Sequence, residues 1–207
     1  MVFMSKKIKK EHLIQDIEII PLSDVTKEFT KNFDCGIKDL NDFLFDDALR
    51  QQKESINVTY LWVSKESKDL LGYITLCNDS IHLFGEKKEE MKQIGISYKA
   101  LPALKICRMG VDKNYSNKRI GTKMIAFAVS IVLEINKMSG CRFLTLAAKN
   151  APNLPEEKRP IHFYQKVGFV VIKEKKQDAS YVPMYEDLKP IINDFIELER
   201  KRTFGSL

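Results

Sequence analysis

Apolar residues recur along this chain at two spacings, one typical of strands and the other typical of helices. Residues 57–63 and 70–78 are rich in β-branched and aromatic side chains, and the charged segment SKESKD between them indicates a hairpin turn. Isoleucine, methionine and phenylalanine recur at helical spacing over residues 117–138, which predicts a long amphipathic helix that begins near residue 118 and ends near Gly140. The other expected elements are a strand at 16–20, a helix at 36–52, a mixed surface segment at 84–100, strands at 103–111 and 141–148, a short helix at 158–167, paired strands at 168–173 and 180–188, and a terminal helix at 189–203.

This alternation of strands and helices predicts an α/β fold. With 207 residues, of which 44% are hydrophobic, the chain is large enough for one well-buried core and small for two. We therefore expect a single domain over 1–207, with its core at 16–188 and a C-terminal helix at 189–203. No apolar run is long enough to cross a bilayer, and the opening MVFMSKKIKK lacks the features of a secretory signal, so we expect a cytoplasmic protein that does not enter membranes.

Charge and cysteine content narrow the classes of partner and site. Lysine and arginine number 34 against 28 aspartate and glutamate, and the net charge of +6 favours anionic partners such as nucleotides or nucleic acid. Cys35, Cys77, Cys107 and Cys141 lie singly and far apart, without a C-x-x-C pair. The sequence thus indicates neither a disulfide framework nor a metal site.

The segment KRIGTKM, residues 118–124, follows a predicted strand and turn and opens the long helix. A helix start offers unpaired backbone N–H groups and a partial positive charge, and Lys118 and Arg119 add full charges. Gly121 would let a ligand approach the backbone where a Cβ would block it. The alternative is that Gly121 is an ordinary first-turn residue and the basic side chains form a solvated face. The segment alone leaves both interpretations open, and it lacks the three spaced glycines of a dinucleotide-binding loop.

The order of elements, with FYQKVGF and YVPMYEDL near the end, resembles the GNAT family of N-acetyltransferases over residues 16–188. The resemblance implies a mixed, mostly antiparallel central sheet with a splayed parallel strand pair, flanked by helices. It also implies acetyl-CoA as cosubstrate and direct transfer of its acetyl group to a primary amine, with no metal.

The family's Q/R-x-x-G-x-G/A motif binds the acetyl-CoA pyrophosphate through backbone amides. Ser116 stands where the family has Gln or Arg, Arg119 stands at the first glycine, and Gly121 matches the last. The resemblance therefore implies one cofactor-binding segment made of Ser116, Asn117, Lys118, Arg119, Ile120, Gly121 and Thr122.

The resemblance assigns further residues to the site. Backbone groups of Met109, Gly110 and Val111 would pair with the pantetheine arm, and an N–H of Met109 or Val111 would polarise the acetyl carbonyl. Asn150 would lie against the cofactor. Tyr164, in the F-Y-x-x-x-G-F motif, would protonate the leaving CoA thiolate. The structural alternative is that Tyr164 only packs its helix against the sheet.

The front half resembles the GNAT subgroup that contains the tRNA-acetylating toxins. Their shared core C-G-x-x-x-L-x-x-[FWY]-L is matched by Cys35, Gly36, Leu40, Phe43 and Leu44. The resemblance implies an aminoacyl-tRNA as acceptor. A small-molecule amine, a protein N-terminus and a non-catalytic module that binds CoA or RNA stay open as alternatives.

Two further expectations concern the acceptor and the assembly. An α-amine, with a pKa of about 7.7–8, needs less help to lose its proton than a lysine side chain near about 10.4, which favours α-amino acceptors. The terminal helix at 189–203 carries enough apolar surface either to cover the sheet or to meet a second chain in a homodimer.

Overall fold

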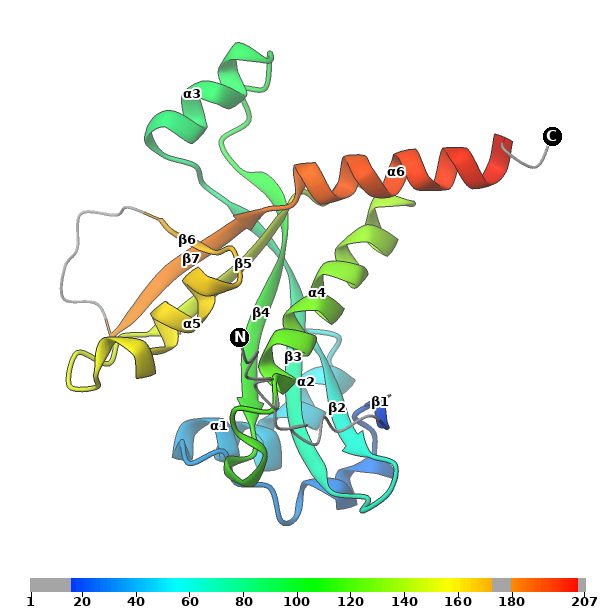
Figure 1. The fold of residues 1–207 in the computed structure, drawn as a ribbon, viewed down its shortest axis with the longest axis vertical. Helices are drawn as coiled ribbons and strands as arrows, with labels where there is room; N and C mark the ends of the chain where they lie inside the picture. Colours follow the sequence, from blue (N-terminus) through cyan, green and yellow to red (C-terminus); the bar gives the residue numbers. More distant parts are fainter. Residues whose placement is uncertain (1–15, 173–179, 205–207) are drawn as a thin grey trace, which may run out of the picture.

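Seven strands form one mixed sheet in the order β1-β2-β3-β4-β5-β7-β6 (Figure 1). The computed structural model describes residues 16–172 and 180–204. Within these residues β4 and β5 are the parallel pair and the other neighbours are antiparallel, so the predicted mixed, mostly antiparallel sheet is confirmed. The strands are β1 Ile17–Pro21, β2 Val58–Ser64, β3 Leu70–Ile81, β4 Leu101–Val111, β5 Phe143–Lys149, β6 Val170–Val171 and β7 Tyr181–Asp187.

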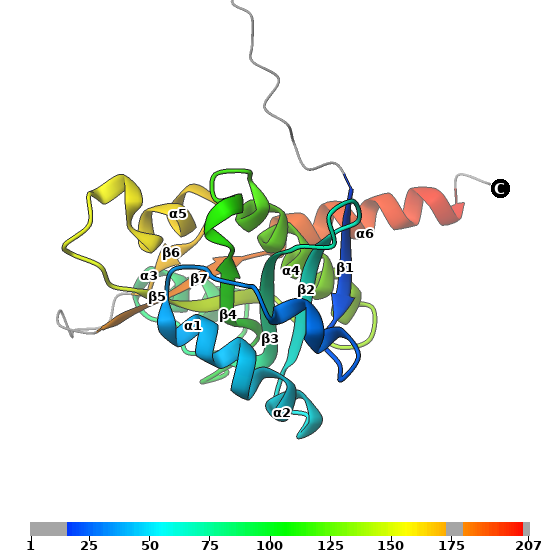
Figure 2. The ribbon, with the colours of Figure 1, turned by 90° about the horizontal axis from the view of Figure 1, so that it is seen from below.

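Helices cover both faces of the sheet (Figure 2). The largest buried cluster joins one face to α4 and α5, and a second cluster joins the opposite face to the π-helical segment Phe43–Asp47 and α2. A third cluster packs α3 against the start of β4 and β5. The helices are α1 Lys38–Asp42, α2 Ala48–Lys53, α3 Gly85–Gln93, α4 Ile120–Asn136, α5 Pro160–Lys166 and α6 Lys189–Phe204.

The long helix α4 forms where the apolar period predicted it. Ile120, Met124, Ala128 and Val132 recur every four residues, and all four are buried on the same face of the sheet. This spacing places them on one stripe of the helix, so burial of that stripe fixes the orientation of α4. The helix is shorter than the predicted 117–138 at both ends.

The predicted helix at 36–52 is divided by a π-helical turn. α1 leads into a π segment at Phe43–Asp47, which is followed by α2. A π turn takes one more residue than an α turn and therefore rotates the apolar face that follows it. Phe43, Leu44 and Ala48 are buried together on the sheet as a result. The apolar spacing could not predict this change of period.

The segment at 84–100 lies at the surface as expected, but it contains the helix α3, which the pattern did not predict. Of its residues only Met91 is buried, and it packs with Leu101 and Phe143. Its lysines and glutamates favour helix without showing an apolar stripe. The final predicted strand pair forms as β6 and β7, although residue 173 lies outside the described residues.

Asp187, the last residue of β7, joins three elements by ion pairs. Arg142, just before β5, donates to its two carboxylate oxygens at 2.8 and 2.7 Å, and Lys87 of α3 lies 2.7 Å away. Burial opposes ionisation of the carboxyl, but the hydrogen bonds from Arg142 and Lys87 outweigh it and lower the pKa of Asp187 to about 2. These ion pairs hold α3 beside the end of β7 and the start of β5.

We expect Asp187→Asn to lower the free energy of unfolding by about 1–2 kcal/mol at pH 7. Because the folded pKa is about 2 and the unfolded value is near 3.8, the stabilisation is complete above pH 4 and is lost as the pH falls toward 2. Urea unfolding of both proteins at pH 7 and pH 2.5 measures this difference. Asp24→Asn, at an exposed pair with Lys53, is the control and should change little. Equal stabilities at pH 7 would contradict the prediction.

The terminal helix α6 extends away from the sheet beyond the end of α4 (Figure 1). Ile192 in its first turn is buried in the main cluster, whereas Ile196 and Leu198 are exposed. Among residues 16–172 and 180–204, no helix combines the length and the apolar character needed to span a bilayer.

Candidate functional site

The strands β4 and β5 separate at one end of the sheet. They pair only from Ala103 opposite Phe143 to Ile106 opposite Leu146, yet β4 continues to residue 111 and β5 to residue 149. The next residue, Cys107, is the extra residue of a bulge, because the pairing of β4 with β3 shifts register between Ile106 and Arg108. A bulge bends its strand, which directs β4 away from β5 and opens the gap between them.

Backbone groups of β4 face this gap. The N–H of Asp112 donates to Leu71 of β3 at 3.0 Å. Since successive residues of a strand direct their hydrogen-bonding groups to opposite sides, those of Gly110 face β3 and those of Met109 and Val111 face the gap. Two of the three residues predicted at this position thus present backbone groups to the gap. Gly110 serves packing instead, because a Cβ there would lie 2.9 Å from the ring of Tyr73.

The predicted cofactor-binding segment, residues 116–122, consists of an exposed turn at 116–119 and the first residues of α4. Asn117 and Arg119 adopt positive φ angles of 63° and 59°, a left-handed conformation that favours glycine. Arg119 occupies the position where the family motif has its first glycine. The backbone conformation that a glycine would permit is therefore present despite the arginine, and it prevents α4 from starting before Ile120.

Amide groups collect at the start of α4. The first hydrogen bond of the helix runs from Lys123 N–H to Arg119 C=O at 3.1 Å. Helix geometry therefore leaves the N–H groups of Ile120, Gly121 and Thr122 without acceptors inside the helix. Lys118 and Arg119 are exposed beside them, and the Lys118 ammonium lies 4.8 Å from the centre of the Tyr115 ring. Amides without helical acceptors, the helix dipole and two cations are together the chemistry that attracts an anion.

Gly121 contacts α5. A Cβ at this position would lie 3.2 Å from the Phe163 ring, a tighter contact than side chains usually make. The glycine thus allows α5 to approach the first turn of α4. Because the Phe163 ring occupies the space where a Cβ would lie, packing alone explains the glycine, without the predicted role in ligand approach. The contact places α5 next to the amide cluster.

Tyr164 lies on α5 between two other aromatic rings, with ring centres 5.2 Å from Phe163 and 5.7 Å from Phe169. The side chain is half-buried. Burial raises the pKa of the Tyr164 hydroxyl to about 12, so the phenol keeps its proton at neutral pH. This arrangement suits a proton donor, and it is equally compatible with the packing role that the sequence left open.

Asn150 directly follows β5 at the open side of the gap. Its N–H donates to Ser180 C=O at 2.9 Å, which connects the end of β5 to the start of β7. The loop that follows is pinned by Arg159, whose guanidinium donates to the carbonyls of Leu154 and Pro152 at 2.9 and 3.0 Å. Pro160 then begins α5, where its fixed φ suits the first helical position.

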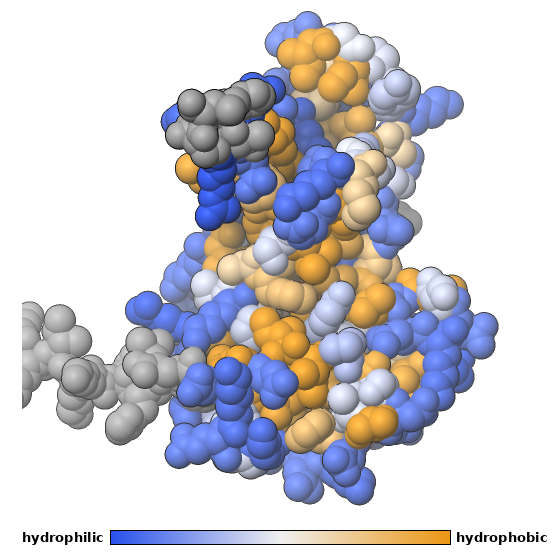
Figure 3. Space-filling view, turned by 90° about the vertical axis from the view of Figure 1, so that its right-hand side faces the viewer, coloured by the Kyte–Doolittle hydropathy of each residue, from blue (hydrophilic) through white to orange (hydrophobic). Residues whose placement is uncertain are grey.

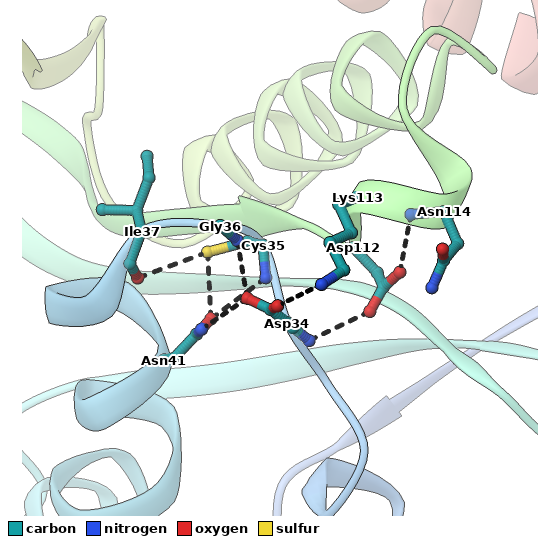
Figure 4. Close-up of polar contacts among 8 residues, drawn as sticks. All are labelled: Asp34, Cys35, Gly36, Ile37, Asn41, Asp112, Lys113 and Asn114. Atoms are coloured by element: carbon teal, nitrogen blue, oxygen red, sulfur yellow. Dashed lines mark hydrogen bonds and ion pairs between the residues drawn. The ribbon is translucent and has the colours of Figure 1, made fainter.

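A polar network that the sequence analysis missed holds the turn after β4 (Figure 4). Asp34 N–H donates to the buried carboxylate of Asp112 at 3.0 Å, and Lys113 binds Asp34 twice, through its ammonium at 2.6 Å and its N–H at 2.9 Å. Asn41 of α1 donates to Asp34 and accepts from the N–H of Cys35. The segment before α1 is therefore fastened to the segment that positions the anion-binding turn.

The electrostatics of this network follow from its hydrogen bonds. The bond from Lys113, followed by those from the Gly36 N–H and Asn41, holds the pKa of the Asp34 carboxyl well below its usual range. Asp34 therefore stays ionised wherever the protein is folded near neutral pH. Aspartate and asparagine beside a turn were the only sequence signal for this network.

The motif shared with the toxin-containing subgroup has a structural explanation. Gly36 adopts a φ of 78° at the turn into α1, a conformation that other residues rarely take. The carbonyl of Leu40 accepts a 2.8 Å hydrogen bond from the hydroxyl of Tyr73, whose ring stacks near Phe43. Leu44 is buried in the same cluster. The motif thus packs α1 onto the sheet and anchors the network described above.

We expect Asp112→Ala to lower the free energy of unfolding by about 2 kcal/mol, because the N–H groups of Asp34 and Asn114 both lose their carboxylate acceptor. Thermal and urea unfolding measure the loss. Asp112→Asn keeps one acceptor oxygen and should lose about half as much. Asp47→Ala, at an exposed pair with Arg50, is the surface control. A loss no larger than that of the control would show that the network does not stabilise the fold.

These features meet on the face of the sheet that carries α4 and α5. Backbone groups of Met109 and Val111 line the gap, amides of α4 open beside it, and Tyr164 stands on the neighbouring helix. Helix-start amides can bind an anion, unpaired strand groups can pair with an extended chain, and a protonated phenol can donate a proton. The described residues contain no group of three or more histidine, cysteine, aspartate or glutamate side chains placed to hold a metal ion.

Comparison with protein families gives one match that covers more than half of the chain. The model of the acetyltransferase (GNAT) domain family matches residues 57–171. These residues include β2 to β6 with the gap, the turn before α4 and α5. A comparison with curated proteins found no match to this sequence.

Solved structures with a similar fold cover most of the chain. A mutant of KacT aligns with a TM-score of 0.71 and 24% identity, over 86% of this chain and 99% of that chain. AtaT complexed with acetyl-methionyl-tRNAfMet aligns with a TM-score of 0.71 and 24% identity, over 87% and 99%. AtaTR bound with AcCoA aligns with a TM-score of 0.68 and 25% identity, over 87% and 98%.

Proposed function

We propose that this chain, which belongs to the GNAT acetyltransferase family, transfers the acetyl group of acetyl-CoA to the α-amine of an aminoacyl-tRNA. The observation that carries this proposal is the anion-binding start of α4 beside the gap between β4 and β5. A CoA thioester has the matching chemistry, since a charged diphosphate is joined to a long, amide-containing arm.

The residues present fit this cosubstrate. The N–H groups of Ile120, Gly121 and Thr122 would bind the diphosphate, with Lys118 and Arg119 adding positive charge. The left-handed conformation of Arg119 supports the fit, because it keeps the loop geometry of the family motif without the glycine. Met109 and Val111 would pair with the amides of the arm, and Asn150 stands where it would contact the same ligand.

Two groups of this chain would then act in the transfer. Acetyl-CoA supplies an activated acetyl group. An N–H of Met109 or Val111 would donate to the acetyl carbonyl oxygen and stabilise the charge that develops on it. Tyr164 would hold a proton at its hydroxyl for the departing thiolate, and its raised pKa keeps that proton in place at neutral pH. Holding acceptor and donor in one gap also lowers the entropic cost of their encounter.

Two observations support an aminoacyl-tRNA as the acceptor. The AtaT structure is a complex with acetyl-methionyl-tRNAfMet, and its fold aligns over 87% of this chain. The net charge of +6 favours an anionic substrate. An α-amine with a pKa of about 8 is neutral in roughly a fifth of its molecules at physiological pH, far more than a lysine side chain, so it needs no strong base.

Incubation with labelled acetyl-CoA and a pool of charged tRNA tests the acceptor directly. We expect label in the RNA fraction, and we expect that prior removal of the amino acids abolishes it. Parallel reactions with small amines and with peptides carrying free N-termini test the alternative acceptors. Calorimetry with acetyl-CoA alone tests the non-catalytic alternative, since a module that binds only RNA gives no heat. Absence of label in RNA together with acetylation of small amines would overturn the tRNA proposal and leave the enzyme activity standing.

We further propose that the chain forms a homodimer through α6. This helix exposes Ile191, Ile196 and Leu198. The side of the molecule toward which α6 extends also shows apolar surface among hydrophilic residues (Figure 3). Exposed apolar patches of this kind commonly mark contacts with another chain. Light scattering on the purified protein, compared with Ile196→Asp and the control Asp194→Asn, tests the dimer.

A cytoplasmic location is likewise our proposal, to be tested by cell fractionation.

A further inference from the structure

Two cysteines on neighbouring strands have no part in the proposed transfer, yet they are in contact. Cys77 lies on β3 and Cys107 lies on β4, and their sulfur atoms are 2.8 Å apart. Both are free thiols, and both are half-buried, so small molecules in solvent can reach them. Their separation of 30 residues along the chain explains why the sequence showed them as single, unrelated cysteines.

The bulge in β4 creates this contact. Cys77 is paired with Lys105 in the β3–β4 register, so Cys107 is its diagonal neighbour. Diagonal neighbours in a regular sheet have Cα atoms about 7–8 Å apart, which is too far for a disulfide without movement of the backbone. Because Cys107 is the extra residue of the bulge, its side chain instead turns toward Cys77. A disulfide of about 2.05 Å would require the two sulfur atoms to approach by only about 0.8 Å.

The other two cysteines of the chain lack such a partner and serve as internal references. The thiol of Cys35 lies 3.1 Å from the Asn41 side-chain oxygen and 3.6 Å from the Ile37 carbonyl. Cys141 is buried in the main core cluster. Within the described residues, neither of these thiols forms a hydrogen bond with another sulfur atom.

We propose that Cys77 and Cys107 form a reversible disulfide by exchange with a low-molecular-weight disulfide. In the first step, the Cys77 sulfur loses its proton to solvent and attacks one sulfur of the small disulfide. The bond between the two small-molecule sulfurs breaks, and the first thiolate leaves and takes up a proton. In the second step, the Cys107 sulfur gives up its proton and attacks Cys77, and the bond to the small molecule breaks. Two protein thiols are oxidised and one small disulfide is reduced to two thiols.

The order of attack follows from the hydrogen bond between the two thiols. Cys107 donates its S–H to the Cys77 sulfur, so the proton of Cys77 lies outside the pair and Cys77 is the attacking atom. Burial, together with the hydrogen bond to Cys77, raises the pKa of the Cys107 thiol, so Cys107 keeps its proton during the first step. The second step is intramolecular and joins atoms that are already in contact, so it should be faster than the first.

The disulfide would affect the gap between β4 and β5. Cys107 directly follows the last residue of β4 that pairs with β5, and Met109 is two residues further on. Closing the bond draws the bulge toward β3 and away from β5. This consequence rests on the proposed function, and we expect the dissociation constant of acetyl-CoA to differ at least threefold between the oxidised and reduced protein.

Exposure of the reduced full-length protein to glutathione disulfide tests the bond itself. After the remaining thiols are blocked with N-ethylmaleimide, intact mass spectrometry should show a product that has lost two hydrogen atoms and carries two blocked cysteines instead of four. Digestion should give a peptide that links Cys77 to Cys107, and dithiothreitol should reverse it. A glutathione adduct on the wild-type protein should stay below about a tenth of the total, because the second step is fast.

Two variants make the result specific. Cys107→Ser removes the second thiol and should trap a stable glutathione adduct on Cys77. Cys35→Ser removes a reference thiol and should leave the linked peptide unchanged. Four blocked cysteines after oxidation, a lasting adduct on the wild type, or a linkage that involves Cys35 or Cys141 would overturn the proposal.

Calorimetry with acetyl-CoA on the same oxidised and reduced samples tests the effect on the gap. If the disulfide forms and the two dissociation constants agree within twofold, the effect on the gap is overturned and the modification stands. If neither form binds acetyl-CoA, the proposed function fails, and the mass result still decides whether the disulfide exists.

Discussion

Tyr164→Phe is expected to lower kcat for acetyl transfer about a hundredfold while leaving the dissociation constant of acetyl-CoA within twofold. The physical reason is that the variant loses only the hydroxyl, which would supply the proton to the departing thiolate, and proton donation of this kind contributes about 10²–10⁴ in rate. The phenyl ring keeps its contacts with Phe163 and Phe169, so the helix α5 should keep its position.

Steady-state kinetics and calorimetry measure the two halves of this prediction. Tyr98→Phe removes a hydroxyl from an exposed tyrosine that lies on the loop before β4, and it should change neither quantity. Because burial raises the pKa of Tyr164 to about 12, kcat of the wild type should show no loss from deprotonation of this residue between pH 8 and 10. If Tyr164→Phe turns over at the wild-type rate, the tyrosine only packs α5 against the sheet, and the proton comes from elsewhere.

Arg119→Glu is expected to weaken the binding of acetyl-CoA by about 30-fold or more. Arg119 immediately precedes the first residue of α4, where the amides of Ile120 and Gly121 would hold the diphosphate. The substitution replaces an attractive charge by a repulsive one at this position, and a change of about 2 kcal/mol corresponds to roughly 30-fold in the dissociation constant. Raising the salt concentration should reduce the difference, since the residue is exposed and its field is screened.

Two further variants separate charge from backbone conformation. Arg200→Glu makes the same change in net charge on the exposed surface of α6 and should leave acetyl-CoA binding unchanged. Arg119→Gly removes the charge but suits the positive φ of 59°, so it should weaken binding by only about threefold to tenfold and should not destabilise the fold. If Arg119→Glu and Arg200→Glu bind acetyl-CoA equally well, the diphosphate does not lie at the start of α4.

Much of the fold could be predicted because its elements follow local patterns. The period of Ile120, Met124 and Ala128 determines the buried stripe of α4, and the alternation of β-branched residues determines the hairpin of β2 and β3. The likeness of the turn before α4 to a pyrophosphate-binding motif could also be read from neighbouring residues. These features depend on side chains within a few positions of one another, which is the range that propensity and periodicity report.

Other parts of the site are created by residues that are distant in the sequence. Asp34 and Asp112 meet across 78 residues, and Cys77 meets Cys107 only because β4 contains a bulge. Likewise, Gly121 is explained by the Phe163 ring that packs against it from α5, which the sequence around Gly121 does not reveal.

By itself, then, the sequence determined the strands, the buried stripe of α4 and the family to which the chain is related. Only the tertiary structure decided the bulge at Cys107 beside the gap, the left-handed conformation of Arg119 at the start of α4, the network at Asp112 and the thiol pair. The physical reason is that local propensity is set by each residue and its near neighbours, whereas these features arise from the register of whole strands and from packing between elements that are joined only by the fold.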